Sequence, residues 1–178
     1  MEGVKIINNQ LSMFMKRLLT SCFGLGRLPL APGTWGSLPP AIAFGLVCYF
    51  GATVLPQFLV MLAFFIAGSL ICLKFSDAAV AATGNDDPNE VVADEIAGQA
   101  LTFMLLIFVM NTGLTVRQIV TIVAMGFFLF RLFDTIKPWP SYRLEELHGG
   151  LGILADDLMA GLYAGICLII ASRVWILK

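Results

Sequence analysis

Five long apolar runs limit what this chain can fold into more than any other feature. They cover residues 39–56, 57–75, 96–110, 118–133 and 158–175. A helix needs roughly 20 residues to cross the hydrocarbon of a bilayer, and the first, third and fourth runs look short for this. Hydrophobic residues make up 58% of the chain and charged residues 13%, against roughly 25% charged in a soluble domain. The sequence therefore predicts an integral membrane protein with an all-α fold.

The predicted architecture is a polytopic helical bundle of about five transmembrane or re-entrant helices, with four crossings as the alternative. We expect residues 1–22 to form a short interfacial segment, because this stretch carries Lys5, Lys16 and Arg17 between apolar residues. Residues 23–178 are expected to form one membrane domain. The net charge of −1 gives no reason to expect nucleic acid as a partner. The sequence gives no oligomeric state.

With five crossings, the segment before the first run and the loops after the second and fourth runs emerge on one face. Eight of the eleven basic residues then lie on that face: Lys5, Lys16, Arg17, Arg27, Lys74, Arg131, Lys137 and Arg143. The positive-inside rule predicts that this face is cytoplasmic. All twelve acidic residues also fall on it. Since the rule ignores acids, this second asymmetry indicates a functional site.

The first acidic cluster precedes the third run. If a helix begins at Pro88, Asp87, Glu90 and Asp94 share one face, where their charges repel unless a cation separates them. Capping is the simpler explanation for Asp87 and Glu90, because they match a capping box around Pro88. It does not explain Asp94 and Glu95, which would lie beyond the first turn.

Two further acidic positions follow along the chain. Asp134 lies near the end of a helix that Pro138 should terminate, where the helix dipole opposes a negative charge. A structural ion pair with Arg131 or Lys137 is the alternative to a ligand or catalytic role. Asp156 and Asp157 follow a glycine-rich turn and are expected to open the last run, where the dipole alone could account for them.

A loop rich in glycine and proline, residues 24–37, leads into the first run. Such a loop exposes backbone N–H groups and hydroxyls that suit a phosphate, although interfacial loops often have this composition for other reasons. Arg27, Thr34 and Ser37 are its candidate phosphate-binding residues.

Charge balance favours a bound divalent cation. Seven carboxylates of the candidate site face three fixed cations, Arg27, Arg131 and Lys137, which leaves four negative charges uncompensated. The carboxylates are Asp87, Glu90, Asp94, Glu95, Asp134, Asp156 and Asp157. The donors are oxygens, with a lone His148 and no thiolate cluster, so Mg²⁺ is favoured over zinc.

Four motifs of this chain resemble the signature of the phosphatidylglycerophosphatase A family, in the family's order. They are LAPGTWGS at 30–37, DPNEVVADE at 87–95, FRLFDTIKP at 130–138 and GGLGILADD at 149–157. The resemblance covers about residues 23–161. It implies a bacterial inner-membrane enzyme that removes the terminal phosphate of phosphatidylglycerophosphate with Mg²⁺, its active site facing the cytoplasm.

On this reading the metal ligands are Asp87, Glu90, Asp94, Asp134, Asp156 and Asp157. The catalytic group comprises Asp94, Glu95, Asp134 and Asp156, with Glu95 as a further ligand or as the general base. Arg27, Thr34, Ser37, Arg131 and Lys137 are expected to bind the substrate phosphate. Attack by water is favoured over a cysteinyl or histidyl phosphoenzyme, and an aspartyl phosphoenzyme remains an alternative.

Two other function classes are compatible with acids near apolar runs. A cation transporter predicts acids facing one another at mid-membrane depth, whereas here they cluster at one side. A lipid phosphotransferase of the CDP-alcohol type would also use Mg²⁺ and carboxylates, but its D-x-x-D-G-x-x-A-R pattern is missing from this chain.

Overall fold

The computed structural model describes residues 2–85, 88–110, 113–144, 147 and 149–176. Every regular element in these residues is a helix, as predicted. The elements are α1 (Glu2–Thr20), the 3-10 turn η1 (Leu25–Arg27), α2 (Pro32–Tyr49), α3 (Val54–Thr83), α4 (Ala93–Ile107), α5 (Val116–Ile136), α6 (Ser141–Leu144), α7 (Gly150–Ala171) and the π-helical turn η2 (Ser172–Ile176).

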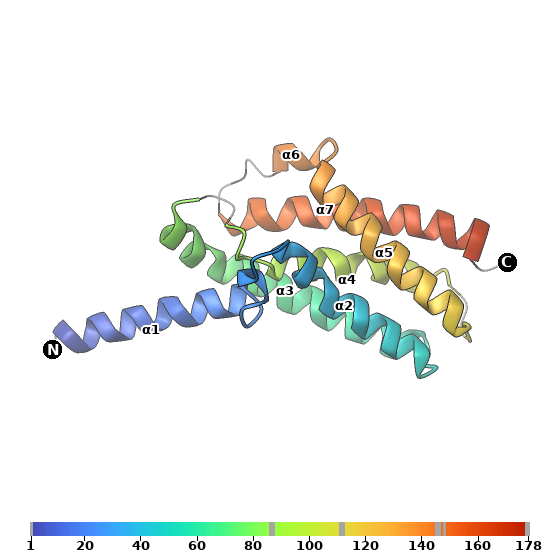
Figure 1. Cartoon of the computed structure of the whole chain (residues 1–178), viewed down its shortest axis with the longest axis horizontal. Helices are drawn as coiled ribbons and strands as arrows, with labels where there is room; N and C mark the ends of the chain where they lie inside the picture. The colour runs from blue at the N-terminus through green and yellow to red at the C-terminus, as the bar shows by residue number, and fades with distance from the viewer. Residues whose placement is uncertain (1, 86–87, 111–112, 145–146, 148, 177–178) are drawn as a thin grey trace.

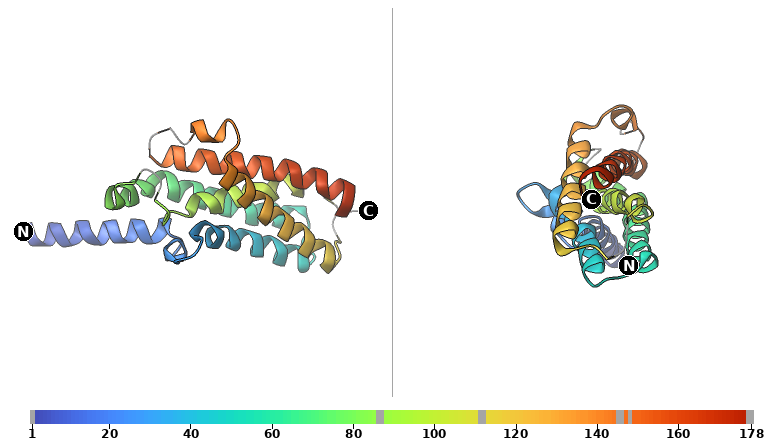
Figure 2. Two further views of the ribbon diagram at one scale, coloured as in Figure 1. Left: turned by 45° about the horizontal axis from the view of Figure 1, so that its top comes forward. Right: turned by 90° about the vertical axis from the view of Figure 1, so that its right-hand side faces the viewer.

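The five apolar runs correspond to α2, α3, α4, α5 and α7, which lie side by side as a bundle with alternating direction (Figure 1). Helix α2 begins earlier than predicted, at Pro32, so residues 32–37, expected as part of a loop, form its first turns, and it ends at Tyr49 rather than at Pro56. The turns before α2, α4 and α7 and the end of α5 therefore meet toward one end. Helix α1 projects beyond that end along the long axis of the bundle (Figures 1 and 2). The backbone N–H of Val92 donates to the carbonyl of Thr20 at 2.9 Å, which joins the end of α1 to the start of α4.

Three helices in the described residues are long and apolar enough to cross a membrane: Val54–Thr83, Val116–Ile136 and Gly150–Val174. This is fewer than the five crossings expected. Helix α4 has 15 residues, roughly 22 Å at 1.5 Å per residue, which is shorter than the roughly 30 Å hydrocarbon core. Most of its residues are buried against α2, α3 and α7. A helix surrounded by protein in this way does not have to match the thickness of the bilayer.

Helices α4 and α7 approach closely because each has a glycine at the crossing. A Cβ on Gly98 would meet the carbonyl of Asp157 at 2.6 Å, and one on Gly161 would meet the carbonyl of Gly98. The Thr102 hydroxyl donates to the carbonyls of Gly98 and Gly161, at 3.1 and 3.3 Å. Small residues and interhelical hydrogen bonds are the usual means of helix association in membranes. This crossing lies one turn from the acidic residues of both helices.

The main apolar core lies further along the bundle from these acidic residues, where α4 packs against α2, α3, α5 and α7. The rings of Phe44 and Phe103 stack there with centroids 4.4 Å apart. Beside them Gly126 of α5 leaves room for the ring of Phe103. These contacts fix α2 and α5 against α4, and so position the two helix ends that complete the site.

Candidate active site

Helix α4 presents two carboxylates in its first turn. It begins at Ala93, so Asp94 and Glu95 are first-turn residues, where the helix dipole favours negative charge. The prediction that a helix begins at Pro88 is wrong, because residues 88–92 form an irregular turn. Glu90 and Asp94 therefore do not share a helical face. Asp87 lies outside the described residues.

Helix α7 presents its two carboxylates further from its start than expected. The helix begins at Gly150, so Asp156 and Asp157 lie in its second turn, and its first turn contains no acid. The dipole falls off within the first turn and does not account for them. Both are buried, with relative exposures of 5% and 3%. Buried carboxylates outside a capping position need a cationic or hydrogen-bonding partner.

Helix α5 supplies the basic residues of the site from its last turns. Arg131 Nη1 lies 2.8 Å from Asp134 Oδ2 and 3.8 Å from Glu95 Oε1, so it bridges α5 and α4. Lys137 follows the helix in the left-handed conformation, and its Nζ lies 2.6 Å from Asp156 Oδ2 on α7. The helix ends at Ile136, two residues before Pro138, as predicted.

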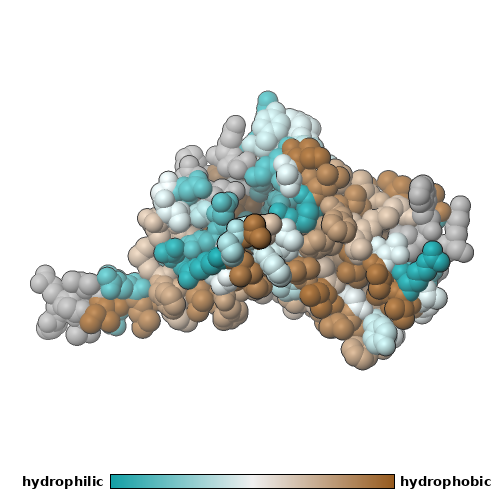
Figure 3. Space-filling view, viewed as in Figure 1, coloured by the Kyte–Doolittle hydropathy of each residue, from teal (hydrophilic) through white to brown (hydrophobic). Residues whose placement is uncertain are grey.

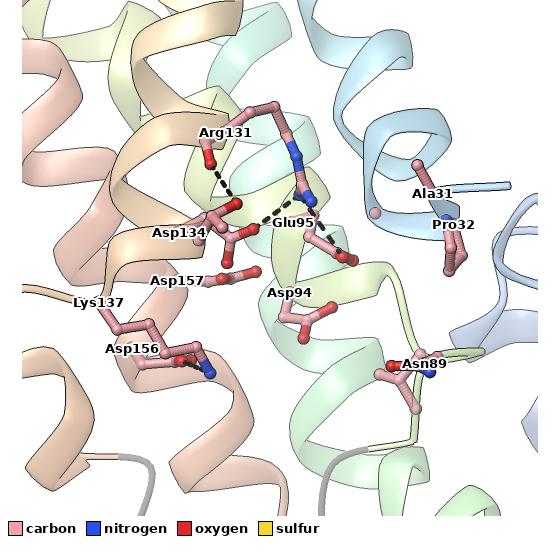
Figure 4. A pocket seen from close by; sticks show the side chains of 13 residues that line it. Ala31, Pro32, Asn89, Asp94, Glu95, Arg131, Asp134, Lys137, Asp156 and Asp157 are labelled. Atoms are coloured by element: carbon pink, nitrogen blue, oxygen red, sulfur yellow. Dashed lines mark hydrogen bonds and ion pairs between the residues drawn. The ribbon is translucent and has the colours of Figure 1, made fainter.

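These residues surround one cavity of about 330 Å³ (Figure 4). The start of α2 forms its opposite wall, with Ala31, Pro32 and Gly33. The other lining residues are Asn89, Val91, Asp94, Glu95, Arg131, Asp134, Thr135, Lys137, Asp156 and Asp157. The cavity thus brings together segments that the sequence separates by more than a hundred residues.

Three carboxylates in the cavity fit a metal ion. Asp94, Glu95 and Asp157 each offer an oxygen, and these oxygens lie within 4.8 Å of one another. Oε2 of Glu95 and Oδ2 of Asp157 are buried and have no hydrogen-bond partner in the described part of the chain. Close, buried oxygens of like charge repel unless a cation lies between them or one carboxylate takes up a proton. An all-oxygen donor set suits a hard cation such as Mg²⁺.

The charge of the cavity has the same sign as the sequence predicted. Five carboxylates and two cations line it, which leaves three negative charges when all are ionised. One divalent ion would cancel most of this excess, and a phosphate brought in with it would restore the negative charge near Arg131 and Lys137. The charge balance therefore admits a phosphate only together with a divalent ion, because a phosphate alone would add to the excess negative charge.

Glu90 belongs to a second group, with Arg17 and Arg27, and does not line the cavity. Arg17 donates to both oxygens of Glu90, at 2.6 and 3.0 Å, and Arg27 donates to Oε2 at 3.3 Å. Burial raises the pKa of Glu90, but the hydrogen bonds and charges of Arg17 and Arg27 outweigh it and hold that pKa below its usual value. Glu90 thus forms ion pairs with Arg17 and Arg27. These ion pairs join α1 and η1 to the turn before α4.

Two hydroxyls predicted to bind phosphate do not line the cavity. Ser37 is fully buried and donates to the carbonyl of Gly33 at 2.8 Å, within α2. Thr34 is partly buried on the same helix. Their neighbour Gly33 lines the cavity instead, and it lies so close to Glu95 and Arg131 that a Cβ there would collide with both side chains.

Sequence reasoning also missed Asn89 and Thr135. Both lie inside recognised motifs and line the cavity. Both residues are polar and lie next to predicted site residues in the sequence, which is the feature that could have indicated them.

The fold and the site define a class of protein: a helical membrane protein with a carboxylate-lined cavity suited to a metal ion and a phosphate group. A family profile described as Phosphatidylglycerophosphatase A matches residues 18–172. The chain belongs to the phosphatidylglycerophosphatase A family, which confirms the resemblance noted in its motifs.

Three curated relatives match most of the chain. Phosphatidylglycerophosphatase A of Haemophilus influenzae is 34% identical over 90% of both chains. Phosphatidylglycerophosphatase A of Escherichia coli is 34% identical over 89% of this chain and 84% of its own length. A Bacteroides thetaiotaomicron protein, named provisionally as a phosphatidylinositol-3-phosphatase, is 31% identical over 90% of this chain and 96% of its own length. No solved structure matches the chain.

Proposed function

We propose that this protein is a phosphatidylglycerophosphatase, which hydrolyses the terminal phosphate monoester of phosphatidylglycerophosphate to phosphatidylglycerol in bacterial phospholipid biosynthesis. Family membership and the names of two relatives support this activity. The observation that carries it is the cavity in which carboxylates from α4, α5 and α7 lie beside Arg131 and Lys137. A lipid phosphate needs both kinds of group, a metal site and fixed cations.

We further propose that Mg²⁺ is the cofactor, held by Asp94, Glu95 and Asp157, with Asp134 and Asp156 at the edge of the same site. Oxygen donors, close spacing and burial support this assignment. When bound, the ion lowers the pKa of water and neutralises charge on the phosphate. Asp87, also expected as a ligand, lies outside the described residues.

The residues of the chain have distinct roles in this proposal. Arg131 and Lys137 donate to phosphate oxygens, where negative charge develops as the ester bond breaks. Asp134 and Asp156, which contact these two cations at 2.8 and 2.6 Å, hold them in position. A carboxylate within reach of the attacking water accepts its proton, and Glu95 is the proposed base or a further ligand. The attacking water, the substrate phosphate and the carboxylate that accepts the proton are thereby held in one cavity.

The proposed location is the bacterial inner membrane, with the cavity at the cytoplasmic face. The relatives are bacterial, three helices suit a bilayer, and basic residues cluster at the cavity end. For residues 1–22 we propose contact with the membrane surface, for which α1 must tilt away from the bundle axis that it follows in Figure 1. Ile7, Leu11 and Phe14 are exposed along one face of α1 at helical spacing, which supports this role.

The direct test is release of inorganic phosphate by the purified protein in detergent. We expect release from phosphatidylglycerophosphate in the presence of Mg²⁺ and loss of activity with excess chelator. Phosphatidylinositol-3-phosphate should be included as the comparison substrate, because one relative carries that name. Faster hydrolysis of the inositol lipid, or activity that persists with chelator, would contradict the substrate or the cofactor respectively.

A further inference from the structure

An apolar groove of about 450 Å³ runs between α2 and α5, apart from the polar cavity. Its walls include Leu38, Ile42 and Leu46 of α2 and Val120 and Phe128 of α5. Among its lining residues Tyr49 alone has a polar side-chain atom. Several walls are open to the surroundings, since Ile42, Leu46, Val120 and Phe128 are each at least 51% exposed. The groove is therefore accessible from the side of the bundle.

The groove begins close to the candidate active site and runs along the same two helices. Pro32 and Gly33 at the start of α2 line the cavity, and Leu38 begins the groove roughly 9 Å further along that helix. On α5 the groove ends at Phe128, three residues before Arg131. Figure 3 shows hydrophobic surface over the region where α2 and α5 lie, next to the hydrophilic surface around the cavity. Polar and apolar sites thus follow one another in the order of a lipid headgroup and its tail.

The length of the groove matches one leaflet of a bilayer. From Leu38 to Tyr49 α2 rises about 17 Å, and from Val116 to Phe128 α5 rises about 18 Å. Half of a typical hydrocarbon core is about 15 Å. A lipid whose phosphate enters the cavity can therefore extend one tail along the whole groove.

A glycine lies in the groove at the contact between its two walls. A Cβ on Gly45 of α2 would lie 3.2 Å from Cγ2 of Val123 on α5, closer than most such contacts. The two walls of the groove are therefore in contact at this point.

We infer that this groove binds one acyl chain of the lipid substrate while its phosphate occupies the cavity. The inference rests on the proposed function. An acyl chain gains no hydrophobic free energy on moving from bilayer hydrocarbon to an apolar groove, so affinity is not its main effect. The groove positions the lipid, and a positioned phosphate reacts faster. Selectivity among chain lengths is the property to measure.

The test fills the groove without disturbing the core. Ala124 lines the groove and is exposed, so Ala124→Trp blocks it from the open side. The matched control is Ala67→Trp, at an exposed alanine of α3 outside the groove. Both variants and the wild type are assayed with long-chain and short-chain phosphatidylglycerophosphate and with the deacylated headgroup, in the same detergent and with Mg²⁺.

We expect Ala124→Trp to lower the ratio of long-chain to deacylated kcat/KM about tenfold, which corresponds to about 1.4 kcal/mol. Ala67→Trp should leave this ratio at the wild-type value. A second variant widens the groove: Phe128→Ala, at a side chain that is 69% exposed, should shift the preference toward bulkier chains. Equal ratios in all four proteins would overturn the inference.

Other results are equally decisive. If Ala124→Trp changes the oligomeric state in detergent and leaves chain selectivity intact, a second copy of the chain occupies the groove and the inference is wrong. If the wild type releases no phosphate at any chain length, the proposed function fails, and the inference fails with it. Failure of the groove alone leaves wild-type hydrolysis unchanged, so the two failures are distinguishable.

Discussion

The acidic residues of the cavity differ in the partners that surround them. Asp134 and Asp156 each have a cation within 2.8 Å, whereas Glu95 has Arg131 only at 3.8 Å. Asp157 is buried and has one oxygen without a hydrogen-bond partner in the described residues. The first pair is placed to hold Arg131 and Lys137. Glu95 and Asp157, together with Asp94, lie close enough together that their oxygens could hold a metal ion.

Asp134→Asn tests the role of a single acidic residue in the cavity. It removes one charge at the cavity and weakens the hold on Arg131, so we expect kcat/KM for phosphate release to fall at least about 10²-fold. Expression and the unfolding temperature should stay close to wild type. Asp77→Asn, at an exposed residue of α3, is the matched control and should stay active. An active Asp134→Asn protein would remove Asp134 from the site.

The elements of this fold bring their ends together, and the site lies where those ends meet. Helix α4 contributes its first turn, α5 its last turns and α7 its second turn, while the start of α2 forms the facing wall. The distance between α4 and α7 decides whether Asp94 and Asp157 can share a ligand. That distance depends on the glycines at their crossing, one turn from the acids.

Gly98→Ala tests this dependence. The added Cβ would meet the Asp157 carbonyl and the Phe130 ring, both at 2.6 Å, so α4 and α7 must move apart. We expect a loss of about 1–3 kcal/mol in stability and a clear loss of phosphatase activity. Gly165→Ala is the control, because its Cβ first meets the end of the Leu105 side chain, which can turn away. Equal effects of the two variants on activity would contradict this account of the crossing.

The whole molecule combines an apolar bundle with one end that carries excess negative charge. When all its groups are ionised, three uncompensated charges in the cavity oppose folding by repulsion, and a divalent ion that bound only the folded chain would relieve it. Stability should therefore depend on the metal even when no substrate is present.

Thermal unfolding in detergent measures this coupling without reference to activity. We expect Mg²⁺ to raise the unfolding temperature, with a gain of about 2.7 kcal/mol at a concentration one hundred times its Kd. Asp157→Asn should reduce the Mg²⁺-dependent rise, while Asp77→Asn should preserve it. An unfolding temperature that does not respond to Mg²⁺ would count against a metal site at Asp94, Glu95 and Asp157.

Much of the architecture was predictable because it follows from local pattern. Apolar runs of helical length predicted α2, α3, α4, α5 and α7, and Pro138 correctly marked the end of α5. Family membership was readable from four short motifs, since these keep chemically specific residues at fixed spacing. Local pattern did not predict where α4 and α7 begin, because Pro88 and the glycine-rich turn allow more than one starting residue.

The sequence by itself determined that this chain is an all-helical membrane protein with acidic motifs concentrated near one end of its helices. Only the tertiary structure decided which charges share a space. It placed Asp94, Glu95, Asp134, Asp156 and Asp157 around one cavity, and it turned Glu90 toward Arg17 and Arg27. The physical reason is that the distance between packed helices decides which charged side chains lie next to one another. At the α4–α7 crossing, that closeness depends on glycines whose role is invisible until the facing backbone is known.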